Sequence, residues 1–348
     1  MDDLIYSTML DGERDSENLL RPKSMDEYIG QETIKNNLAV YIQAAKRRGD
    51  NLDHVLLYGP PGLGKTTLAH IIANELGVPI TVTSGTAIPS KFEMSAILSK
   101  LQHNEVLFID EIHRLPASLE EILYPAMEDF KLDFVTGKGL AATSVNVPVE
   151  KFTLIGATTK AGNLAAPLRD RFGMQMRLVP YTDDQLKQIV INSAKRLNVE
   201  IDQNAALEIA KRSRQTPRIA NRILRRVRDF AEVFSGGVIN LEITKISLER
   251  MQIDCLGLDS VDKNLIVTLI TKFNGGPVGL NTLASATGED ALTIEDVYEP
   301  YLMQLGFIAR SPRGRVCMPN AYKHYGIKPT KEQMTQMSLF DLEQNENK

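Results

Sequence analysis

Short apolar runs alternate with amphipathic stretches through the first half of the chain. The runs occupy residues 55–58, 78–82, 106–109, 152–157 and 174–179, with helical patterns between them at 66–76, 92–101 and 118–127. Near-continuous apolar strands separated by helices are typical of a parallel sheet with helices on its faces. An earlier helical spacing (Ile34, Leu38, Ile42) follows Arg21-Pro22 and ends at Gly49. We therefore predict an α/β domain over residues 21–181.

The pattern becomes wholly helical after residue 182. Four stretches, at 183–197, 203–213, 217–234 and 241–255, predict a small helical domain over residues 182–255. Helical patterns at 260–273, 281–287 and 294–305 then precede a β-like segment at 307–318, which a Ser-Pro-Arg-Gly turn interrupts. Three helices and a hairpin indicate a winged-helix domain over 256–330. Residues 1–20 and 331–348 are expected to be a flexible lead-in and a disordered tail.

Composition sets outer limits on the class of protein. Of the 348 residues, 43% are apolar and 24% charged, which excludes wholesale disorder. No apolar run is long enough to cross a membrane, and the first residues lack the pattern of a secretory signal. Two distant cysteines, Cys255 and Cys317, exclude a disulfide framework and fit a reducing cytoplasm. The net charge of −4 still allows a local basic face.

Residues 59–66, Gly-Pro-Pro-Gly-Leu-Gly-Lys-Thr, match the phosphate-loop pattern between a predicted strand and a predicted helix. Gly62 and Gly64 allow the backbone N–H groups to surround phosphates, and the helix directs its positive end to the same place. Lys65 supplies a charge for the β and γ phosphates of ATP, and Thr66 offers a hydroxyl to Mg²⁺. Eight matched positions in this context favour a phosphate site over a simple glycine-rich turn.

Two further strands end in polar residues. Asp110 and Glu111 follow the run at 106–109, where Asp110 would hold Mg²⁺ and Glu111 would polarise the attacking water as a general base. Thr158 and Thr159 follow the run at 152–157. A hydroxyl there can sense the γ-phosphate or orient water, although the two threonines can also simply end a strand.

Two groups of arginines have alternative readings. Arg169 and Arg171 lie close after Pro167, and are either solvated or salt-bridged, or one is a finger that reaches a neighbouring subunit's nucleotide. Thr216 is predicted to be an N-cap with Pro217 at the first helical position. Arg218 then lies in the first turn, where a cation opposes the helix dipole. A γ-phosphate across a domain cleft would explain its position.

Basic residues gather in two places. Residues 211–228 carry eight and no acid, which indicates a solvated face or a subunit contact, with a DNA surface as the less favoured alternative. Residues 307–328 also carry no acid, and their basic side chains include Arg310, Arg313 and Arg315. The preceding helix has only acids, at Glu295, Asp296 and Glu299. We therefore expect this wing, and not the helix, to bind duplex DNA through its phosphates without sequence preference.

A hairpin is predicted between residues 130 and 148. Leu132 and Phe134 alternate on one arm, and Val145 and Val147 on the other. The connection at 137–142 places apolar residues near a tip, which is a candidate partner surface. The alternative is that the hairpin packs on its own domain.

These motifs together resemble the RuvB family of AAA+ ATPases, the Holliday-junction branch-migration motors. The resemblance covers about residues 18–326. It is carried by Leu20-Arg21-Pro22, Tyr28-Ile29-Gly30-Gln31, the phosphate loop, Asp-Glu-Ile-His-Arg-Leu at 110–115, Ile-Gly-Ala-Thr-Thr at 155–159, Leu-Arg-Asp-Arg-Phe-Gly at 168–173, Thr-Pro-Arg-Ile-Ala-Asn-Arg at 216–222 and the Arg310–Arg315 segment.

The resemblance implies a P-loop (AAA+) parallel-sheet domain, a helical lid and a winged-helix domain. It assigns Lys65, Thr66 and Thr67 to nucleotide and Mg²⁺, with Thr66 and Asp110 as the protein ligands of the metal and Glu111 completing the Walker B pair. Thr159 would be the first sensor, Arg171 the arginine finger and Arg218 the second sensor. The residues around the nucleotide would be Leu20, Arg21, Gly62, Gly64 and Tyr181. Arg310, Arg313 and Arg315 would contact DNA.

The same resemblance implies an ATP hydrolase that drives branch migration of Holliday junctions in recombination, repair and the SOS response. It implies a hexameric ring on duplex DNA, with RuvA docked through the hairpin at 130–148 and the RuvC resolvase in the same complex. ATP would be hydrolysed between subunits, since Arg171 can complete only a neighbour's site.

Two rival functions and one extra partner remain open. A clamp-loader ATPase usually has Ser-Arg-Cys around its finger, whereas Arg169-Asp170-Arg171 stands here. A DNA-binding scaffold with a dead nucleotide site would not need Lys65 and Glu111 together. Separately, Gln336-Met337-Ser338-Leu339-Phe340 resembles the short peptide by which bacterial DNA enzymes dock the sliding clamp, although so short a pattern also recurs by chance.

Overall fold

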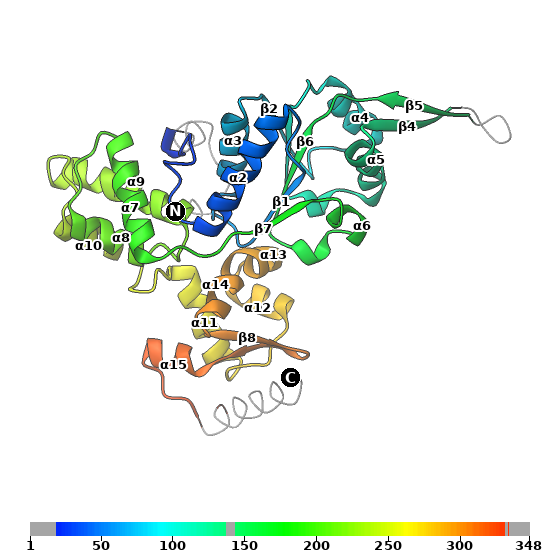
Figure 1. The fold of residues 1–348 in the computed structure, drawn as a ribbon. Coiled ribbons are helices and arrows are strands. Elements are labelled where there is room, and N and C mark those ends of the chain that lie inside the picture. Colours follow the sequence, from blue (N-terminus) through cyan, green and yellow to red (C-terminus); the bar gives the residue numbers. More distant parts are fainter. Residues whose placement is uncertain (1–18, 137–142, 331–332, 334–348) are drawn as a thin grey trace. The chain divides into compact units, whose positions relative to one another are not determined.

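The computed structural model describes residues 19–136, 143–330 and 333, and divides the chain into two compact units, residues 1–241 and 242–348 (Figure 1). Most of the predicted lead-in, the hairpin tip and the tail peptide at 336–340 lie outside the described residues. Among the helices in the described parts, none is long and apolar enough to cross a membrane.

The first unit is built on a parallel sheet of five strands in the order β2-β3-β6-β1-β7 (Figure 1). All five predicted strands are present, with ends shifted by at most two residues. Their bounds are β1 Val55–Tyr58, β2 Ile80–Ser84, β3 Val106–Asp110, β6 Thr153–Thr158 and β7 Met174–Arg177. Leu56, Leu107 and Leu154 of the three central strands are fully buried, as near-continuous apolar runs require.

Helices and short helical turns connect these strands and form the lid. The helices are α2 Glu32–Arg48, α3 Lys65–Leu76, α4 Lys91–Lys100, α5 Ala117–Glu128, α6 Ala166–Arg169, α7 Asp183–Arg196, α8 Gln203–Lys211 and α9 Pro217–Phe234. The 3-10 turns η1 Ile112–Arg114 and η3 Ala161–Asn163, and the four-residue α6, are too short to give a periodic pattern. Gly49 ends α2 in the left-handed conformation, as expected of a C-terminal glycine.

The predicted hairpin at 130–148 is present as β4 Lys131–Thr136 and β5 Thr143–Pro148, which pair antiparallel and extend away from the sheet (Figure 1). Its base is anchored, because Leu132 is buried in the same apolar cluster as Phe152. Val145 and Val147 on the other arm are exposed. The hairpin therefore packs on its own domain only at its base.

Strand order decides which chain segments meet at one edge of the sheet. β6 lies between β1 and β3, with Tyr58 opposite Thr158 and Ile109 opposite Gly156. The carboxyl ends of parallel strands share an edge, which is where α/β proteins bind ligands. The phosphate loop after β1, Asp110 at the end of β3 and the threonine pair after β6 therefore converge.

The segment before α2 is clamped to the linker that leads from β7 to α7. The Gln31 side chain donates to the Val179 carbonyl at 2.7 Å and accepts from the Val179 N–H at 3.1 Å. Gly30, at φ +78°, lies against the buried ring of Tyr181, where a Cβ would approach the ring to 2.8 Å. These contacts tie the start of the ATPase domain to the start of the lid.

The second unit contains helices and a two-stranded wing around its own core. Its elements are α10 Leu241–Arg250, α11 Ser260–Lys272, α12 Leu280–Thr287, α13 Ala291–Thr293, η4 Ile294–Tyr298, α14 Glu299–Gln304, β8 Ile308–Ser311, β9 Gly314–Cys317 and α15 Pro319–Tyr325. The core packs α11, α12 and α14 against the wing through residues such as Leu265, Leu283, Leu302 and Ile308.

Two helix predictions in this unit need correction. The helix predicted at 241–255 ends at Arg250, since Gln252 is left-handed at φ +56°. The helix predicted at 294–305 begins at Ala291 and contains a π turn, η4, just before Pro300. Proline has no N–H to complete the regular helical ladder, and a wider turn accommodates that loss.

We expect Gly30→Ala to destabilise the first unit more than Gly77→Ala does. The two glycines share nearly the same φ, +78° and +75°, but a Cβ at Gly77 meets nothing within 4 Å. Gly77→Ala should therefore cost only the left-handed conformation, about 1–2 kcal/mol, whereas Gly30→Ala adds roughly 1–3 kcal/mol of overpacking against Tyr181. Urea unfolding of both variants measures the difference in the free energy of unfolding. Equal losses of that free energy would show that the Tyr181 ring moves aside without cost.

Candidate functional site

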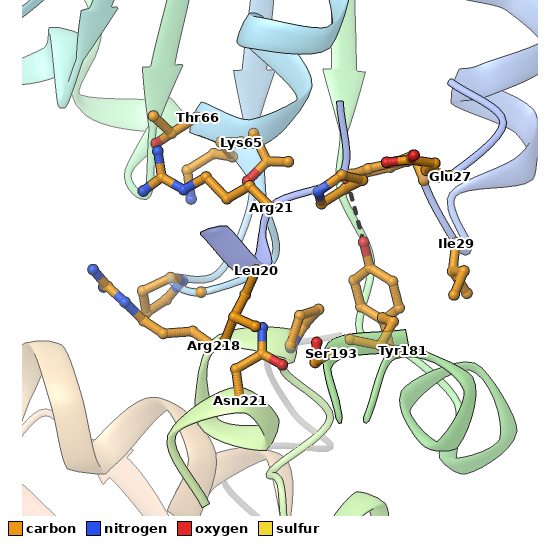
Figure 2. Close-up of a pocket in the computed structure, with 18 of the residues that line it drawn as sticks. Leu20, Arg21, Glu27, Ile29, Lys65, Thr66, Tyr181, Ser193, Arg218 and Asn221 are labelled. Carbon is orange, nitrogen blue, oxygen red and sulfur yellow. Dashed lines mark hydrogen bonds between the residues drawn. The ribbon is translucent and has the colours of Figure 1, made fainter. Parts of the chain in front are cut away.

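The phosphate loop connects β1 to α3 and forms one wall of a cleft (Figure 2). Gly62 and Gly64 have positive φ, at +78° and +95°, so the loop curls in a way that other residues rarely adopt. The Lys65 Nζ donates to the carbonyls of Gly59 and Pro60 at 2.9 and 3.0 Å. Burial lowers the pKa of Lys65, while the charges of Glu111 and Asp110 act to raise it.

Asp110 and Glu111 line the same cleft as Lys65 and Thr66. Asp110 Oδ1 accepts the Glu111 N–H at 3.0 Å, and Glu111 itself is left-handed at φ +46°. This sharp turn lets the two neighbouring carboxylates reach into the cleft from a single strand end. The oxygen donors of Thr66 and Asp110 are the hard ligands that Mg²⁺ prefers, so the residues present fit that cation.

The Glu111 carboxylate is held by two partners on neighbouring segments. Its Oε2 accepts from the Thr159 hydroxyl at 3.2 Å and lies 3.2 Å from His113 Nδ1, which is 2.8 Å from the Thr158 hydroxyl. Thr159, which the sequence resemblance assigns as the first sensor, therefore contacts Glu111 directly. His113 was visible in the sequence only as part of a motif, without a role.

The lid supplies the opposite wall of the cleft (Figure 2). Thr216 and Pro217 start α9 as predicted, and the Arg218 N–H donates to the Gly62 carbonyl at 3.4 Å. A Cβ on Gly62 would lie 3.2 Å from Cβ of Arg218, so only glycine permits this approach without a shift. The structure thus brings Arg218 and the phosphate loop together, as the sequence suggested.

The far end of the cleft is formed by the N-terminal segment and by Tyr181. Leu20, Arg21 and Tyr181 line it, together with Thr67 from α3. The Tyr181 hydroxyl donates to the Leu63 carbonyl at 3.3 Å and lies 3.2 Å from the Tyr28 hydroxyl. Burial raises the pKa of both tyrosines, which keeps them neutral hydrogen-bonding groups.

Several cleft residues were not identified from the sequence. On α7 they follow a helical spacing, at Ile189, Asn192, Ser193 and Arg196. The Arg196 guanidinium donates to the Leu20 carbonyl at 2.6 Å and to Glu27 at 2.8 Å. The spacing was readable as one helix face, but nothing in it distinguished a face turned to the cleft from a solvated one.

Arg171 does not line this cleft. Its guanidinium contacts Glu128 at 3.2 Å, donates to the Pro167 carbonyl at 2.6 Å and lies 4.5 Å from the ring centroid of Tyr124. Arg169 is half exposed beside Asp170. The structure thus separates Arg171 from the nucleotide residues of its own chain.

Part of the basic run at 211–228 is paired with acids of its own helices, at Arg212, Arg226 and Arg228. Arg212 pairs with Glu208 at 2.6 Å, and Arg228 contacts Asp229 at 2.9 Å and Glu232 at 3.5 Å. These contacts favour the reading of an ordinary ion-paired face over a DNA surface.

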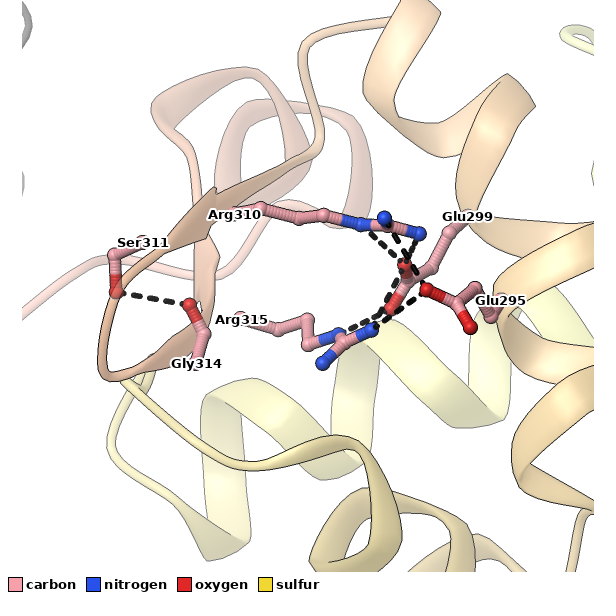
Figure 3. A network of polar contacts seen from close by, with 6 residues as sticks. All are labelled: Glu295, Glu299, Arg310, Ser311, Gly314 and Arg315. Carbon is pink, nitrogen blue, oxygen red and sulfur yellow. Dashed lines mark hydrogen bonds and ion pairs between the residues drawn. The ribbon is translucent and has the colours of Figure 1, made fainter. Parts of the chain in front are cut away.

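The wing of the second unit is a separate basic site (Figure 3). β8 and β9 pair antiparallel, with Arg310 directly opposite Arg315, and Arg313 is exposed in the turn between them. The sequence argument used the acids of the preceding helix only as a reason why this helix would not read DNA, and the structure shows a further use for one of them. Glu299 is buried and accepts hydrogen bonds from both Arg310 and Arg315.

Comparison with protein families gives three successive matches. The model described as the Holliday junction DNA helicase RuvB P-loop domain matches residues 20–178, the RuvB AAA lid domain matches 181–254, and the RuvB C-terminal winged helix domain matches 255–326.

Comparison with solved structures gives the same family. A Thermotoga maritima structure described as the RuvB Holliday junction branch migration motor is 50% identical, covers 89% of this chain and 99% of that chain, and has a TM-score of 0.80. A lysine-to-arginine mutant and an arginine-to-alanine mutant of that protein match with the same identity and coverage, at TM-scores of 0.81 and 0.80. The chain belongs to the RuvB family and is a P-loop ATPase of the helicase type, which sets aside the clamp-loader and dead-scaffold alternatives.

Proposed function

We propose that this protein hydrolyses ATP between the subunits of a hexameric ring and uses the energy to move duplex DNA through a Holliday junction, in recombination and repair. One observation carries the proposal. Lys65, Asp110, Glu111 and Arg218 converge on one cleft, whereas Arg171 lies outside it. A finger that does not line the cleft of its own chain is suited to completing the cleft of a neighbour.

The cleft residues divide the work of binding ATP. The N–H groups of the loop at Gly62 and Gly64 surround the phosphates, Lys65 exchanges its two loop carbonyls for phosphate oxygens, and Thr67 binds beside them. Leu20, Arg21 and Tyr181 enclose the rest of the nucleotide. Thr66 and Asp110 hold Mg²⁺, which when bound neutralises charge on the β and γ phosphates.

Glu111 accepts the proton of the attacking water, and two neighbours orient its carboxylate for this task. The Thr159 hydroxyl and His113 Nδ1 both contact Oε2 of Glu111, which leaves Oε1 of Glu111 to accept from water. As the water oxygen attacks the γ phosphorus, its proton passes to Glu111 and the bond to the ADP oxygen breaks. Thr159 can also report the γ-phosphate to Glu111, because it contacts both the carboxylate and the cleft.

We expect Glu111→Gln to bind ATP normally and to hydrolyse it at least 10²-fold more slowly, since general-base catalysis contributes about 10²–10⁴-fold. The amide keeps the shape and the Thr159 contact but cannot take a proton. Steady-state phosphate release and nucleotide binding separate the two effects. Glu150→Gln, an exposed site, is the control. Near-normal turnover by Glu111→Gln would assign the base elsewhere.

Arg171 completes the nucleotide site of a neighbouring subunit, and contacts within its own subunit hold its side chain in position. Glu128, the Pro167 carbonyl and the Tyr124 ring hold the guanidinium on one side, with the side chain still 23% exposed. A partly fixed arginine loses less entropy when it meets the γ-phosphate.

We expect Arg171→Ala to bind ATP and to lose about 10³–10⁵ in hydrolysis rate. Mixing it with Lys65→Ala subunits should restore part of the activity, because one variant supplies the intact cleft and the other the finger. Arg169→Ala is the matched control and should remain active. If mixing never rescues, and Arg169→Ala is the inactive variant, then Arg169 is the finger.

The wing holds the DNA on which the motor acts. Arg310, Arg313 and Arg315 contact phosphates, which every sequence presents alike, and this suits a motor that must cross any sequence. Arg313 is the most readily available of the three, because it lies exposed in the turn, whereas Arg315 is mostly buried.

We expect Arg310→Ala and Arg313→Ala to weaken binding to all duplexes equally, each reducing the salt slope by about one. Basal ATP hydrolysis should be retained. Fluorescence anisotropy of two unrelated duplexes over a salt series is the measurement, and a changed preference between them would mean that the wing reads bases.

The partners of the motor follow the family. RuvA docks on the hairpin of β4 and β5, which extends from the sheet and exposes Val145 and Val147, and RuvC joins the same assembly. The protein works in the cytoplasm, where both cysteines stay as free thiols. The tail peptide at 336–340 is a further docking motif, for the sliding clamp.

A further inference from the structure

The wing contains two like charges placed directly opposite each other. Arg310 and Arg315 are cross-strand partners on β8 and β9, a position in which like charges destabilise a hairpin. The backbone gives them no freedom to separate, because Arg315 exchanges two further hydrogen bonds with Val278, at 2.7 and 3.0 Å. Another group must therefore compensate their repulsion.

Glu299 provides that compensation from within the core. It is 0% exposed, and its two oxygens together accept hydrogen bonds from both arginines. Oε2 accepts from Arg310 Nε and Nη2 at 2.9 and 2.6 Å, and Oε1 accepts from Arg315 Nε at 2.6 Å (Figure 3). A buried carboxylate needs such partners, and they in turn hold both guanidinium groups in one place. Solvent and DNA cannot reach it, so it stays in place when DNA binds.

Glu295 lies one turn earlier and makes a different kind of contact. Its Oε1 is 3.3 Å from Arg310 Nη1 and 3.8 Å from Arg315 Nη2, and the side chain is 31% exposed. Of these two outer nitrogens, Arg310 Nη1 is left over by Glu299, whereas Arg315 Nη2 also donates to Glu299 Oε2 at 3.4 Å. A single carboxylate oxygen between two outer guanidinium nitrogens occupies the place that a phosphate oxygen would take.

The helix geometry puts both acids on the wing side. Glu295 lies in the π turn η4, and Glu299 begins α14 directly after it. In the wider turn, residues four apart come close to alignment, so both carboxylates face the two arginines (Figure 3).

We propose that Glu295 is a built-in phosphate surrogate that competes with DNA for the seat between Arg310 and Arg315, while Glu299 positions the two arginines for it. The proposal rests on the proposed DNA contact of the wing. Exchange of one anion for another keeps the arginine pair neutralised in both states. It lowers the affinity for any one phosphate, and a motor that must release each phosphate in turn benefits from this.

The deciding experiment compares Glu295→Gln with Glu249→Gln in the full-length protein. Glu249 is an exposed acid of α10 in the same unit, so its removal changes the net charge equally. We expect Glu295→Gln to bind a fluorescein-labelled duplex about two- to fivefold more tightly, the worth of an exposed ion pair. Its salt slope should also steepen by up to about one. Glu249→Gln should change neither beyond a general charge effect.

Glu299→Gln should have the opposite effect, weakening DNA binding and lowering the melting temperature, because it leaves the arginines without their buried anion. If Glu299→Gln fails to fold, the DNA binding of Glu295→Gln still tests the proposal. Binding by Glu295→Gln that is equal to or weaker than the Glu249→Gln control would overturn the proposal. Arg310→Ala tests the premise separately. If it leaves DNA binding unchanged, the wing contact itself is wrong, whereas weakened binding with no gain in Glu295→Gln rejects only the surrogate.

Discussion

The nucleotide cleft depends on one steric constraint, the close approach of three separate segments to the phosphate loop. Gly59 lies against the Leu178 carbonyl, Gly62 against Arg218 and Gly64 against the Tyr28 hydroxyl, and a Cβ at these positions would come within 2.6 to 3.2 Å of those neighbours. The glycines are needed for conformation and also for space. Because each contact reaches a different part of the chain, the loop holds the sheet, the lid and the N-terminal segment together.

This packing places segments from different parts of the chain around the cleft. The N-terminal segment reaches the lid through Arg196 and the linker through Gln31, so the cleft is bounded by the sheet, the lid and this segment. A ligand shifts a conformational equilibrium only through contacts that differ between the two states. Arg218 and Tyr181, on the lid side, and Lys65, on the sheet side, all line the cleft and are placed to make such contacts.

In the wing, the constraint is the repulsion between neighbouring positive charges, and not steric contact. A surface that binds DNA needs clustered cations, yet clustered cations repel one another and weaken the hairpin that carries them. Glu299 resolves this by neutralising Arg310 and Arg315 from the buried side. The phosphate loop and the wing thus both hold their cations on internal oxygens: the carbonyls of Gly59 and Pro60 for Lys65, and the Glu299 carboxylate for the arginines.

Local pattern was enough to predict the order of strands and helices, the phosphate loop and the Asp110-Glu111 pair, because apolar periodicity and glycine spacing are properties of neighbouring residues. Contacts between distant residues were not predictable in this way. His113 and Arg196 gained their roles only when β3 and α7 were brought to the cleft, and nothing in a helical repeat marks which face will meet a ligand. From the sequence, the acids at 295–299 indicated only that their helix does not read DNA, and only the structure pairs Glu295 and Glu299 with the arginines. Burial and pairing determine what a charge does, and only the tertiary structure decides both.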